Sequence, residues 1–560
     1  MLIKKTSALS AINRIRKVYD TFSISDFKYG NEKKKRIVVL GSGWGGINFL
    51  INIDFRKYDV VLVSPRSYFT FTPLLPFFIS GTIGVNTCTD KVHNFLKKNK
   101  NVSKYYEYEC TDILHNDNII NCIDKNNNKI KINYDYLVIS VGAKTNTFNI
   151  KGVETFALFF KDVNDALKVR EKLFYNLNIC ITKEKKLLED EKKKLLHIVV
   201  VGGGPTGVEV TAEIADFVND EIKKKYKKIF HYISISIIEG GNYLLPTFTK
   251  DISEFTKQNF KKYNVNVFTN FHVIEIDKDY VYIKSSLIKT DSDTLGNSSN
   301  TVSSTNISNY KNKSNLVEPL KMKLPYGMVI WASGLAQTPL VNKFLKTIPK
   351  QAKNRAIHVN QQLKVNGINS ENIYAIGDCK IIEPIKLHDH VRDIIQFLNS
   401  SKLSSEILKK KSKELSKLFP QVSCNKWCYE SNKKEHMTEL EFSDYLLKID
   451  KNYKTPIPTA QNAKQEAYYL SDVFNYYLSN PNKKEINVIP SFIENWQGSL
   501  AYIGNKEAVA HLPFYEIVGG PFSFTFWKMV YLQLLLTWKA KYNFVKDYIR
   551  TNIKGRTLFK

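Results

Sequence analysis

Short apolar runs alternate with longer amphipathic stretches along most of this chain, which is the pattern of an α/β protein. Residues 36–64 read as a strand, a glycine-rich turn, a helix and a second strand, and the segment from 197 to 240 repeats that order. Further apolar strands that end in small residues are expected at 134–143, 326–334 and 372–379. Because strands and helices alternate, the pattern predicts two Rossmann-like dinucleotide-binding units.

The two glycine turns carry the strongest local signal. "RIVVLGSGWGGINF" begins at Arg36 and "HIVVVGGGPTGVEV" at His197, and each contains G-x-G-x-x-G after an apolar strand. The first glycine turns the chain, the second lets backbone approach a pyrophosphate, and the third lets the helix pack on the strand. The glycines in these roles are Gly41, Gly43 and Gly46, then Gly202, Gly204 and Gly207. One such motif can merely connect a strand to a helix, but two of them predict two dinucleotides, one in each unit.

Three segments break the α/β pattern. Residues 1–34 are basic, and "MLIKKTSALSAINRIRKVYD" has no acid before Asp20, so we expect a mitochondrial transit segment, the alternative being a frayed basic tail. Segment 284–318 is rich in Ser, Asn, Thr and Lys and reads as a disordered insertion. Residues 386–455 read as a lysine-rich helical insertion without a calcium-binding loop.

Composition narrows the possible functions. The net charge of +28 permits nucleic acid or an anionic membrane as a partner, although most lysines lie in Lys- and Asn-rich runs typical of solvated surface. None of the seven cysteines forms a C-x-x-C pair, which disfavours zinc, iron–sulfur and disulfide-framework sites, and we predict no metal site. No cysteine occurs in "SPRSYFTFTPLLPFF", where flavin-dependent disulfide reductases need a redox pair.

The C-terminal tail is aromatic, apolar and basic. Segment 521–538 is rich in Phe, Trp and Leu but is interrupted by Lys528 and Gln533, so no run of about 18–20 apolar residues is present. A following helix is expected to carry an apolar side (Val545, Tyr548, Ile549, Ile553) and a basic side (Lys546, Arg550, Lys554). This pattern predicts an amphipathic anchor lying on an anionic membrane, with a core-packing helix pair as the alternative.

Several longer strings resemble one family, the type II NADH:quinone oxidoreductases, or single-chain alternative NADH dehydrogenases. They are "SPRSYFTFTPLLP" (64–76), "GGGPTGVEVTAEI" (202–214), "WASG" (331–334), "AIGDC" (375–379), "PTAQNAKQEAYYL" (458–470) and "GSLAYIG" (498–504). The resemblance covers roughly residues 35–385 and 456–555. It implies a two-dinucleotide-binding flavoprotein fold, FAD held non-covalently in the first unit, NADH in the second, and electron transfer to ubiquinone.

Glu239 closes the second strand of the second unit, in "IIEGG". A carboxylate there can accept both ribose hydroxyls of NADH and would repel the 2′-phosphate of NADPH, so we predict a preference for NADH; the alternative is a solvated acid at a strand end. The residues expected to bind NADH are Gly202, Gly204, Pro205, Thr206, Gly207, Glu209, Glu239, Ala332, Ser333 and Gly334.

The equivalent position of the first unit is Ser64 rather than an acid, so Ser64 and Arg66 are the candidates for the FAD ribose contact. Asp378 resembles the family's aspartate that binds the ribityl–phosphate region, a role compatible with capping a helix. The residues expected to bind FAD are Gly41, Ser42, Gly43, Gly46, Ser64, Arg66, Thr72, Pro73, Gly142, Ala143, Gly377, Asp378, Ala460 and Gln461.

Gln461 and Gln465 are four residues apart on a helix expected to begin near Pro458–Thr459, and therefore share a face. Spacing alone would suit an exposed glutamine face, but the resemblance implies quinone-site residues beside the flavin. Small residues (Ala460, Ala463, Ala467) adjoin them and would let a flat ring approach. The resemblance also makes Glu209 a candidate for positioning or proton handling, against a structural helix-start acid. The candidate catalytic residues are Glu209, Gln461 and Gln465.

The expected organisation is an FAD unit at 35–160, an NADH unit at 161–324 and a return to the FAD unit at 325–385. Beyond the helical insertion, 456–512 forms the FAD and quinone region and 513–560 the membrane-anchoring region. We expect a mitochondrial, inner-membrane-associated NADH:ubiquinone oxidoreductase of the rotenone-insensitive, non-proton-pumping type, a homodimer, and no nucleic acid partner. A soluble reductase that passes electrons to a protein carrier is the alternative, and a basic nucleic-acid-binding protein is a third. Ping-pong and ternary mechanisms both stay open, as does the membrane face.

Overall fold

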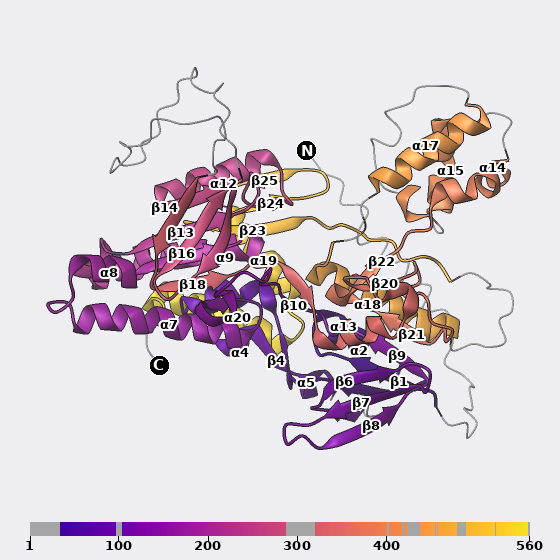
Figure 1. Cartoon of the computed structure of the whole chain (residues 1–560), viewed down its shortest axis with the longest axis horizontal. Coiled ribbons are helices and arrows are strands. Elements are labelled where there is room, and N and C mark those ends of the chain that lie inside the picture. Colours follow the sequence, from indigo (N-terminus) through magenta and orange to yellow (C-terminus); the bar gives the residue numbers. More distant parts are fainter. Residues whose placement is uncertain are drawn as a thin grey trace, which may run out of the picture.

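The computed structural model describes residues 34–96, 104–286, 320–399, 403–416, 419–422, 437–453, 455, 457–478, 489–520 and 522–557. Two α/β units lie side by side, and a small helical unit stands apart from both (Figure 1). The transit segment lies outside the described residues apart from Lys34, and most of the 284–318 insertion does too. That insertion begins later than expected, because Lys284 and Ser285 still belong to a strand.

The first unit is built on a parallel five-stranded sheet in the order β21-β9-β1-β2-β5. Its strands are β1 (Arg36–Leu40), β2 (Asp59–Val63), β5 (Lys104–Tyr106), β9 (Tyr136–Ile139) and β21 (Ile373–Ala375). The apolar side chains of β1 are buried on both faces, as a sheet covered by helices requires. Helices α2 (Trp44–Asn52) and α18 (Ala460–Asp472) pack against each other on this sheet, although more than 400 residues separate them.

The second unit repeats the plan with a parallel sheet in the order β11-β18-β12-β13-β14. Its strands are β11 (Ala157–Phe159), β12 (His197–Val201), β13 (Ser234–Glu239), β14 (Val265–Thr269) and β18 (Met328–Trp331). Because β18 pairs with β12, the second unit extends past the boundary expected at residue 324. Its main helices are α7 (Val163–Thr182), α8 (Glu189–Leu195), α9 (Pro205–Phe217) and α12 (Lys250–Lys262).

Each unit also carries an antiparallel three-stranded sheet. One comprises β6 (Glu109–Leu114), β7 (Ile119–Ile123) and β8 (Lys129–Asn133), and the other β15 (Phe271–Ile276), β16 (Tyr280–Ser285) and β17 (Lys321–Pro325). The shorter elements are β3 (Tyr68–Thr70), β4 (Thr89–Lys91), β20 (Ile357–Val359), β22 (Lys380–Ile382), α3 (Leu75–Ile79), α4 (Val85–Cys88), α5 (Val92–Leu96), α6 (Val153–Phe156), α10 (Lys223–Lys225), α11 (Lys227–Phe230) and α13 (Pro339–Lys346).

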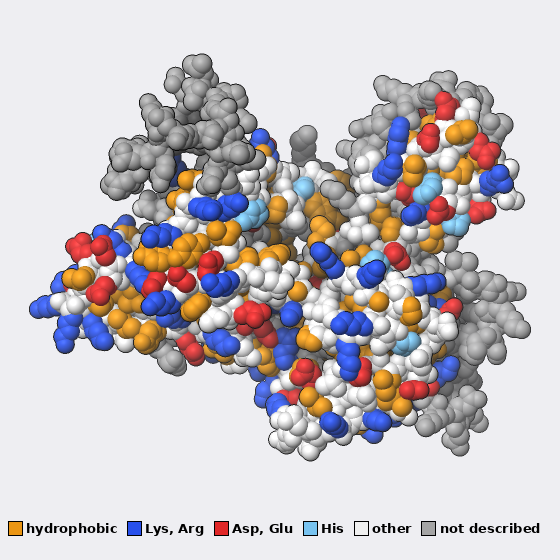
Figure 2. Space-filling view, in the orientation of Figure 1, with side chains coloured by type: hydrophobic (Ala, Val, Ile, Leu, Met, Phe, Trp, Pro, Cys, Tyr) orange, Lys and Arg blue, Asp and Glu red, His pale blue; other side chains and the backbone are white. Residues whose placement is uncertain are grey.

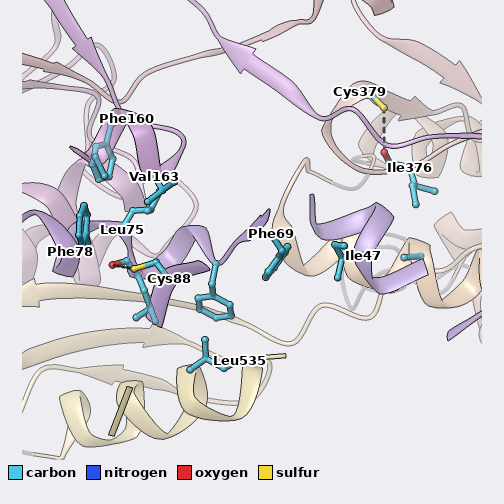
Figure 3. Close-up of a cluster of buried hydrophobic side chains, with 14 of the residues drawn as sticks. Ile47, Phe69, Leu75, Phe78, Cys88, Phe160, Val163, Ile376, Cys379 and Leu535 are labelled. Carbon is cyan, nitrogen blue, oxygen red and sulfur yellow. Dashed lines mark hydrogen bonds between the residues drawn. The ribbon is translucent and has the colours of Figure 1, made fainter. Parts of the chain in front are cut away.

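Two features join the units. Strands β10 (Ala143–Thr145) and β19 (Leu335–Gln337) form an antiparallel ribbon that connects the end of β9 to the end of β18. A buried hydrophobic cluster continues from the first unit through α3 and the start of α7 to the tail, which contributes Leu535 (Figure 3). The Cys88 thiol donates to the Leu74 carbonyl at 3.7 Å. One face of the tail therefore packs into the core, which is the alternative that its sequence pattern left open.

The tail folds into a sheet and two helices. Strands β23 (Ser499–Gly504), β24 (Glu507–His511) and β25 (Glu516–Val518) precede α19 (Ser523–Leu534) and α20 (Trp538–Lys554). No helix among the described residues is long and apolar enough to cross a membrane.

Helix α20 has a buried and an exposed side. Ala540, Phe544 and Asp547 face the protein, whereas an exposed apolar stripe follows the opposite side. The stripe consists of Trp538, Tyr542, Val545, Ile549 and Ile553. Tyr548, expected on the same side as Val545 and Ile549, instead packs between Phe524 and Phe544. One position along a helix is a rotation of about 100°, which is enough to move this ring from the surface into the core.

The insertion is helical, as expected. Helices α14 (Val391–Leu398), α15 (Ser405–Leu415) and α17 (Glu439–Asn452) surround a core of their own. The Asp450 carboxylate, near the end of the insertion, accepts the backbone N–H groups of Leu387 and His388 at 3.0 and 3.1 Å. The two ends of the insertion are therefore tied together at its base.

Candidate active site

A cavity of about 860 Å³ lies between the two units, at the carboxyl ends of both parallel sheets. It has the size of a cofactor site. The predicted residues that line it are Gly41, Ser42, Gly43, Arg66, Thr72, Gly142, Ala143, Gly377, Asp378 and Ala460 from the FAD set, with Thr206, Ala332 and Gly334 from the NADH set. One continuous space therefore touches residues expected to bind two different dinucleotides.

The glycine turns of the two units have the same geometry. Gly41 and Gly202 have φ angles of +102° and +113°, which glycine adopts without strain. A Cβ at Gly46 or Gly207 would overlap the carbonyl oxygen of the first glycine of its turn. At Gly43 and Gly204, by contrast, an added Cβ would meet no atom within 4 Å. The middle glycine of each turn thus leaves open space where a phosphate group can approach the backbone.

The helices that follow these turns leave their first N–H groups available. Neither Gly43, before α2, nor Gly204, before α9, can offer a capping side chain, and no side chain caps either helix. Other helices of the described chain are capped, α18 by Thr459 and α20 by Thr537. Unpaired amides at the positive end of a helix dipole are a ready site for phosphate. Both turns therefore fit a pyrophosphate.

The serine that replaces the usual acid of the first unit is part of a hydrogen-bonded cluster. The Ser64 hydroxyl lies 2.9 Å from that of Ser42, and the Arg66 N–H donates to Ser64 Oγ at 3.3 Å. Arg66 also forms an ion pair with Asp162, which caps α7. Ser64 itself is buried and does not line the cavity, so the guanidinium of Arg66 is the predicted ribose contact that faces the open space.

Asp378 lies at the cavity wall in a short helical turn after β21. The ammonium group of Lys161, two residues before α7, is 3.6 Å from its carboxylate. Beneath this turn a fully buried ion pair, Lys380–Glu466 at 2.6 Å, joins it to α18, and the Gly377 N–H donates to Glu466 at 2.6 Å. Burial raises the pKa of Glu466, which the ammonium and the N–H oppose. Lys161 and this buried pair were not predicted, because no local pattern marks them.

Glu239 lies at the end of β13 and faces the glycine turn of its own unit. Its two carboxylate oxygens accept the N–H groups of Gly203 at 2.6 Å and Gly241 at 2.7 Å. A carboxylate has about four acceptor positions, so two remain for ribose hydroxyls. The expected role therefore fits the geometry of a carboxylate held in place by backbone.

Thr72 and Pro73 lie in the turn between β3 and α3, where Thr72 Oγ1 accepts from the Trp44 indole at 3.2 Å. After β18, the Trp331 indole donates to the Ser333 carbonyl at 3.1 Å, and the Ala332 and Gly334 backbones reach the cavity. The other predicted residues do not line the cavity: Gly46, Pro73 and Gln461 of the FAD set, and Gly202, Gly204, Pro205, Gly207, Glu239 and Ser333 of the NADH set.

Gln461 and Gln465 share a face of α18, as predicted, and this face is covered by the segment before β23. The Gln465 side chain both donates to the Asn495 carbonyl and accepts from its N–H, each at 2.9 Å. Gln461 Nε2 is 3.3 Å from Gln497 Oε1. Ala460 and Ala463, on the neighbouring face, line the cavity. The helix thus places its small residues toward the cavity and its two glutamines beside it.

Glu209 does not line the cavity in this structure. Its buried carboxylate accepts the Tyr502 N–H at 3.1 Å, and burial raises its pKa to about 8. Glu213 and Asp216 follow on the same side of α9, and burial raises the pKa of both, that of Glu213 to about 7. The helix therefore carries three protonatable carboxylates that face the tail.

One cation from the tail enters this acidic group. The Arg556 guanidinium, 9% exposed, lies 3.4 Å from Glu213 and 3.3 Å from Asp220, and it donates to Thr82 at 3.0 Å. The sequence pattern placed the tail at a membrane and gave no sign of this contact, because residues 340 positions apart share no local signal.

Comparisons with known proteins agree with this arrangement. The family model for pyridine nucleotide-disulphide oxidoreductases matches residues 35–397, a helical insertion domain model (PfNDH2) matches 389–453, and an NDH2 C-terminal domain model matches 496–557. A mitochondrial external alternative NAD(P)H-ubiquinone oxidoreductase of Solanum tuberosum is 32% identical, covering 94% of this chain and 90% of the relative. An external alternative NADH-ubiquinone oxidoreductase of Yarrowia lipolytica is 28% identical, with 99% and 85% covered.

Two solved structures are similar to this chain. NDH2 from Plasmodium falciparum in complex with NADH has a TM-score of 0.84 at 57% identity, covering 94% of this chain and all of that one. The sulfide:quinone oxidoreductase of Aquifex aeolicus, at 16% identity and a TM-score of 0.56, shares the fold alone. With residues of both α/β units lining one cavity and family models matching most of its length, this chain belongs to the type II NADH dehydrogenases, within the pyridine nucleotide-disulphide oxidoreductase family.

Proposed function

We propose that this chain is a mitochondrial, FAD-dependent NADH:ubiquinone oxidoreductase whose two substrates react from opposite units of one cavity. The observation that supports this most strongly is the cavity lined by both units, with the glycine turn of the first unit and Thr206, at the start of α9, in its wall. FAD, when bound, supplies the chemistry, by taking a hydride from NADH and passing two electrons to ubiquinone. The enzyme class, the cofactor and the mitochondrial location follow from the family.

The residues of the chain have the following roles in this proposal. The amides of the Gly41–Gly46 turn and the α2 N-terminus would hold the FAD pyrophosphate. Arg66 would hold the FAD ribose, and Asp378 would hold the ribityl–phosphate region. The corresponding turn before α9 holds NADH, with Glu239 on the ribose hydroxyls. Hydride transfer needs orientation rather than an acid or base, so precise placement by these turns is the main contribution of the protein.

The N-terminus of α18 is the third part of the site. Thr459 caps the helix, and Ala460 and Ala463 bring its first turn to the cavity wall. The positive end of the helix dipole stabilises negative charge that develops nearby during reduction. We assign Gln461 and Gln465 to the quinone, and Glu209, which is buried behind Tyr502, to proton handling.

The test is to follow the flavin spectrum anaerobically in the wild type and in Gln461→Ala/Gln465→Ala. NADH should bleach the flavin equally fast in both proteins, because neither glutamine lies in the NADH unit. Reoxidation by a short-chain ubiquinone should be at least tenfold slower in the variant, and reoxidation by ferricyanide unchanged. Equal ubiquinone rates would remove the glutamines from the quinone site. A wild type that reduces a protein carrier but not ubiquinone would favour the soluble-reductase alternative.

We place the exposed stripe of α20 (Trp538, Tyr542, Val545, Ile549, Ile553) in the surface of an anionic membrane. Lys546 and Lys554 are exposed beside this stripe, and an apolar face with basic flanks is the pattern of an in-plane helix. Arg550, expected on the same basic side, instead donates to the carbonyls of Gly81 and Thr82. On the face drawn in Figure 2, Lys and Arg side chains are spread over both units with acids between them. On that face the distribution disfavours a nucleic acid site, which needs a concentrated basic stripe.

Ile549→Glu should weaken binding to vesicles that contain a phosphoglycerol lipid by about tenfold, since it places a charge in the exposed stripe proposed to enter the membrane and adds repulsion from the anionic lipid. Leu440→Glu, a change at another exposed apolar residue, on α17, is the matched control and should have no effect. Deleting the tail would not be a clean test of membrane binding, because the other face of the tail packs into the core. We further propose a homodimer through the C-terminal region; if Ile549→Glu lowers the sedimentation mass and leaves vesicle binding intact, the stripe is a dimer contact instead.

A further inference from the structure

The turn that carries Asp378 is held by a side chain from a distant part of the sequence. This short helical turn, Gly377–Cys379, joins β21 to β22. One carboxylate oxygen of Glu466, on α18, accepts the Gly377 N–H at 2.6 Å, and the other lies 2.6 Å from the Lys380 ammonium group. Glu466 therefore binds the residue that begins the turn and the residue that follows it.

One side of this turn meets the cavity and the other meets the core. Asp378 lines the cavity, whereas Cys379 is fully buried and its thiol donates to the Ile376 carbonyl at 3.3 Å (Figure 3). Gly377 has a φ angle of +75°, in the left-handed region that favours glycine. Because its two ends and its core side are fixed, the turn presents the Asp378 carboxylate to the cavity in a defined orientation.

The ion pair itself is buried behind the cavity wall. The side chains of Lys380 and Glu466 are 4% and 1% exposed, and neither residue lines the cavity. Burying two charges is costly even when they are paired, and neutral side chains of similar volume often give an equally stable fold. The pair is therefore not explained by stability alone, whereas a carboxylate is well suited to bind an N–H group with one oxygen and an ammonium group with the other.

We propose that Glu466 is a positioning residue for FAD, which fixes the Gly377–Cys379 turn and thereby aims the Asp378 carboxylate at the ribityl–phosphate region. The inference rests on the proposed function only in taking FAD as the occupant of the cavity. It predicts that the fold can lose both buried charges. It also predicts that tight FAD binding needs a hydrogen-bond acceptor at position 466, because the Gly377 N–H otherwise has no partner to hold the turn.

Two double variants of the full-length enzyme test this. Lys380→Met/Glu466→Gln removes both charges and keeps an acceptor for the Gly377 N–H, whereas Lys380→Met/Glu466→Leu removes the acceptor as well. Circular dichroism should show that both are folded. Equilibrium dialysis should give a dissociation constant for FAD at least tenfold higher in the leucine variant than in the glutamine variant, which should stay within threefold of the wild type. Lys380→Met/Glu466→Met replaces the leucine variant if that protein does not fold.

Adding Asp378→Asn to both double variants separates positioning from a general packing effect. If Glu466 acts through Asp378, the difference in FAD affinity between the two should fall below threefold. Ser471→Ala is the control, since it removes a buried hydroxyl of α18 that donates to the Ala467 carbonyl at 2.7 Å, and it should leave FAD binding unchanged. Equal FAD affinity in the two double variants would overturn the proposal, as would a full difference that persists after Asp378→Asn. A wild type that binds no FAD would instead overturn the proposed function.

Discussion

Replacing Gly43 by leucine is expected to give a folded protein that no longer retains FAD. An added side chain at Gly43 meets no protein atom within 4 Å, so the fold should tolerate it. The leucine would project into the space through which the pyrophosphate reaches the α2 amides. Loss of two charge-assisted hydrogen bonds, at about 1.5–3 kcal/mol each, weakens binding by roughly two orders of magnitude or more. The measurements are flavin absorbance per protein and circular dichroism.

Gly204→Leu is the matched control, because the second turn has the same open geometry. It should purify with a full complement of FAD, while the dissociation constant for NADH rises by a similar factor, about 100-fold or more. Comparing FAD content and NADH binding in the two variants therefore shows which unit binds which dinucleotide. If Gly43→Leu kept its flavin and Gly204→Leu lost it, the assignment of FAD and NADH to the units would be reversed.

Arg556→Met is expected to destabilise the protein by about 1–2 kcal/mol more near pH 8 than near pH 5, since it leaves buried carboxylates without their cation. Burial raises the pKa of Glu213 from its ordinary 4.5 to about 7 even with the guanidinium present. Without that cation the pKa rises further, and the folded protein binds a proton that the unfolded chain releases. Folding stability is then lost as pH rises through this range, so the penalty should be small near pH 5 and largest near pH 8.

Chemical unfolding at the two pH values measures this difference. Adding Glu213→Gln should restore most of the lost stability at pH 8, because a neutral amide needs no cation. Lys554→Met, an exposed change near the end of α20, should have little effect at either pH. A penalty that is the same at pH 5 and pH 8, and unaffected by Glu213→Gln, would show that Arg556 acts through packing alone.

Local signals predicted the parts of the molecule in which neighbours in sequence are neighbours in space. The glycine turns, the strands before them and the shared face of Gln461 and Gln465 all follow from short-range spacing. The strand β18 was assigned to the wrong unit because its apolar run is equally suited to either sheet. Which sheet a buried strand joins depends on pairing with distant strands, and that information is absent from the run itself.

The contacts that complete the site are long-range and polar. Lys161–Asp378, Lys380–Glu466 and Arg556–Glu213 each join residues from separate elements, and each lysine or arginine is one of 82 in the chain. Nothing in the sequence separates these few from the solvated majority. Tyr548 was misplaced for a related reason, since helical periodicity gives the apolar sides of α20 but not which of them meets the protein.

The tie between Asp450 and the Leu387–His388 backbone has an evolutionary consequence. Because the polypeptide leaves and rejoins the catalytic body at nearly the same point, the three helices between form an insertion domain with a hydrophobic core of its own. An insertion of this kind can change in sequence, become shorter or be gained as a whole without altering the geometry of the dinucleotide sites. Lineages of this family are thus free to carry different modules at this junction around one unchanged redox centre.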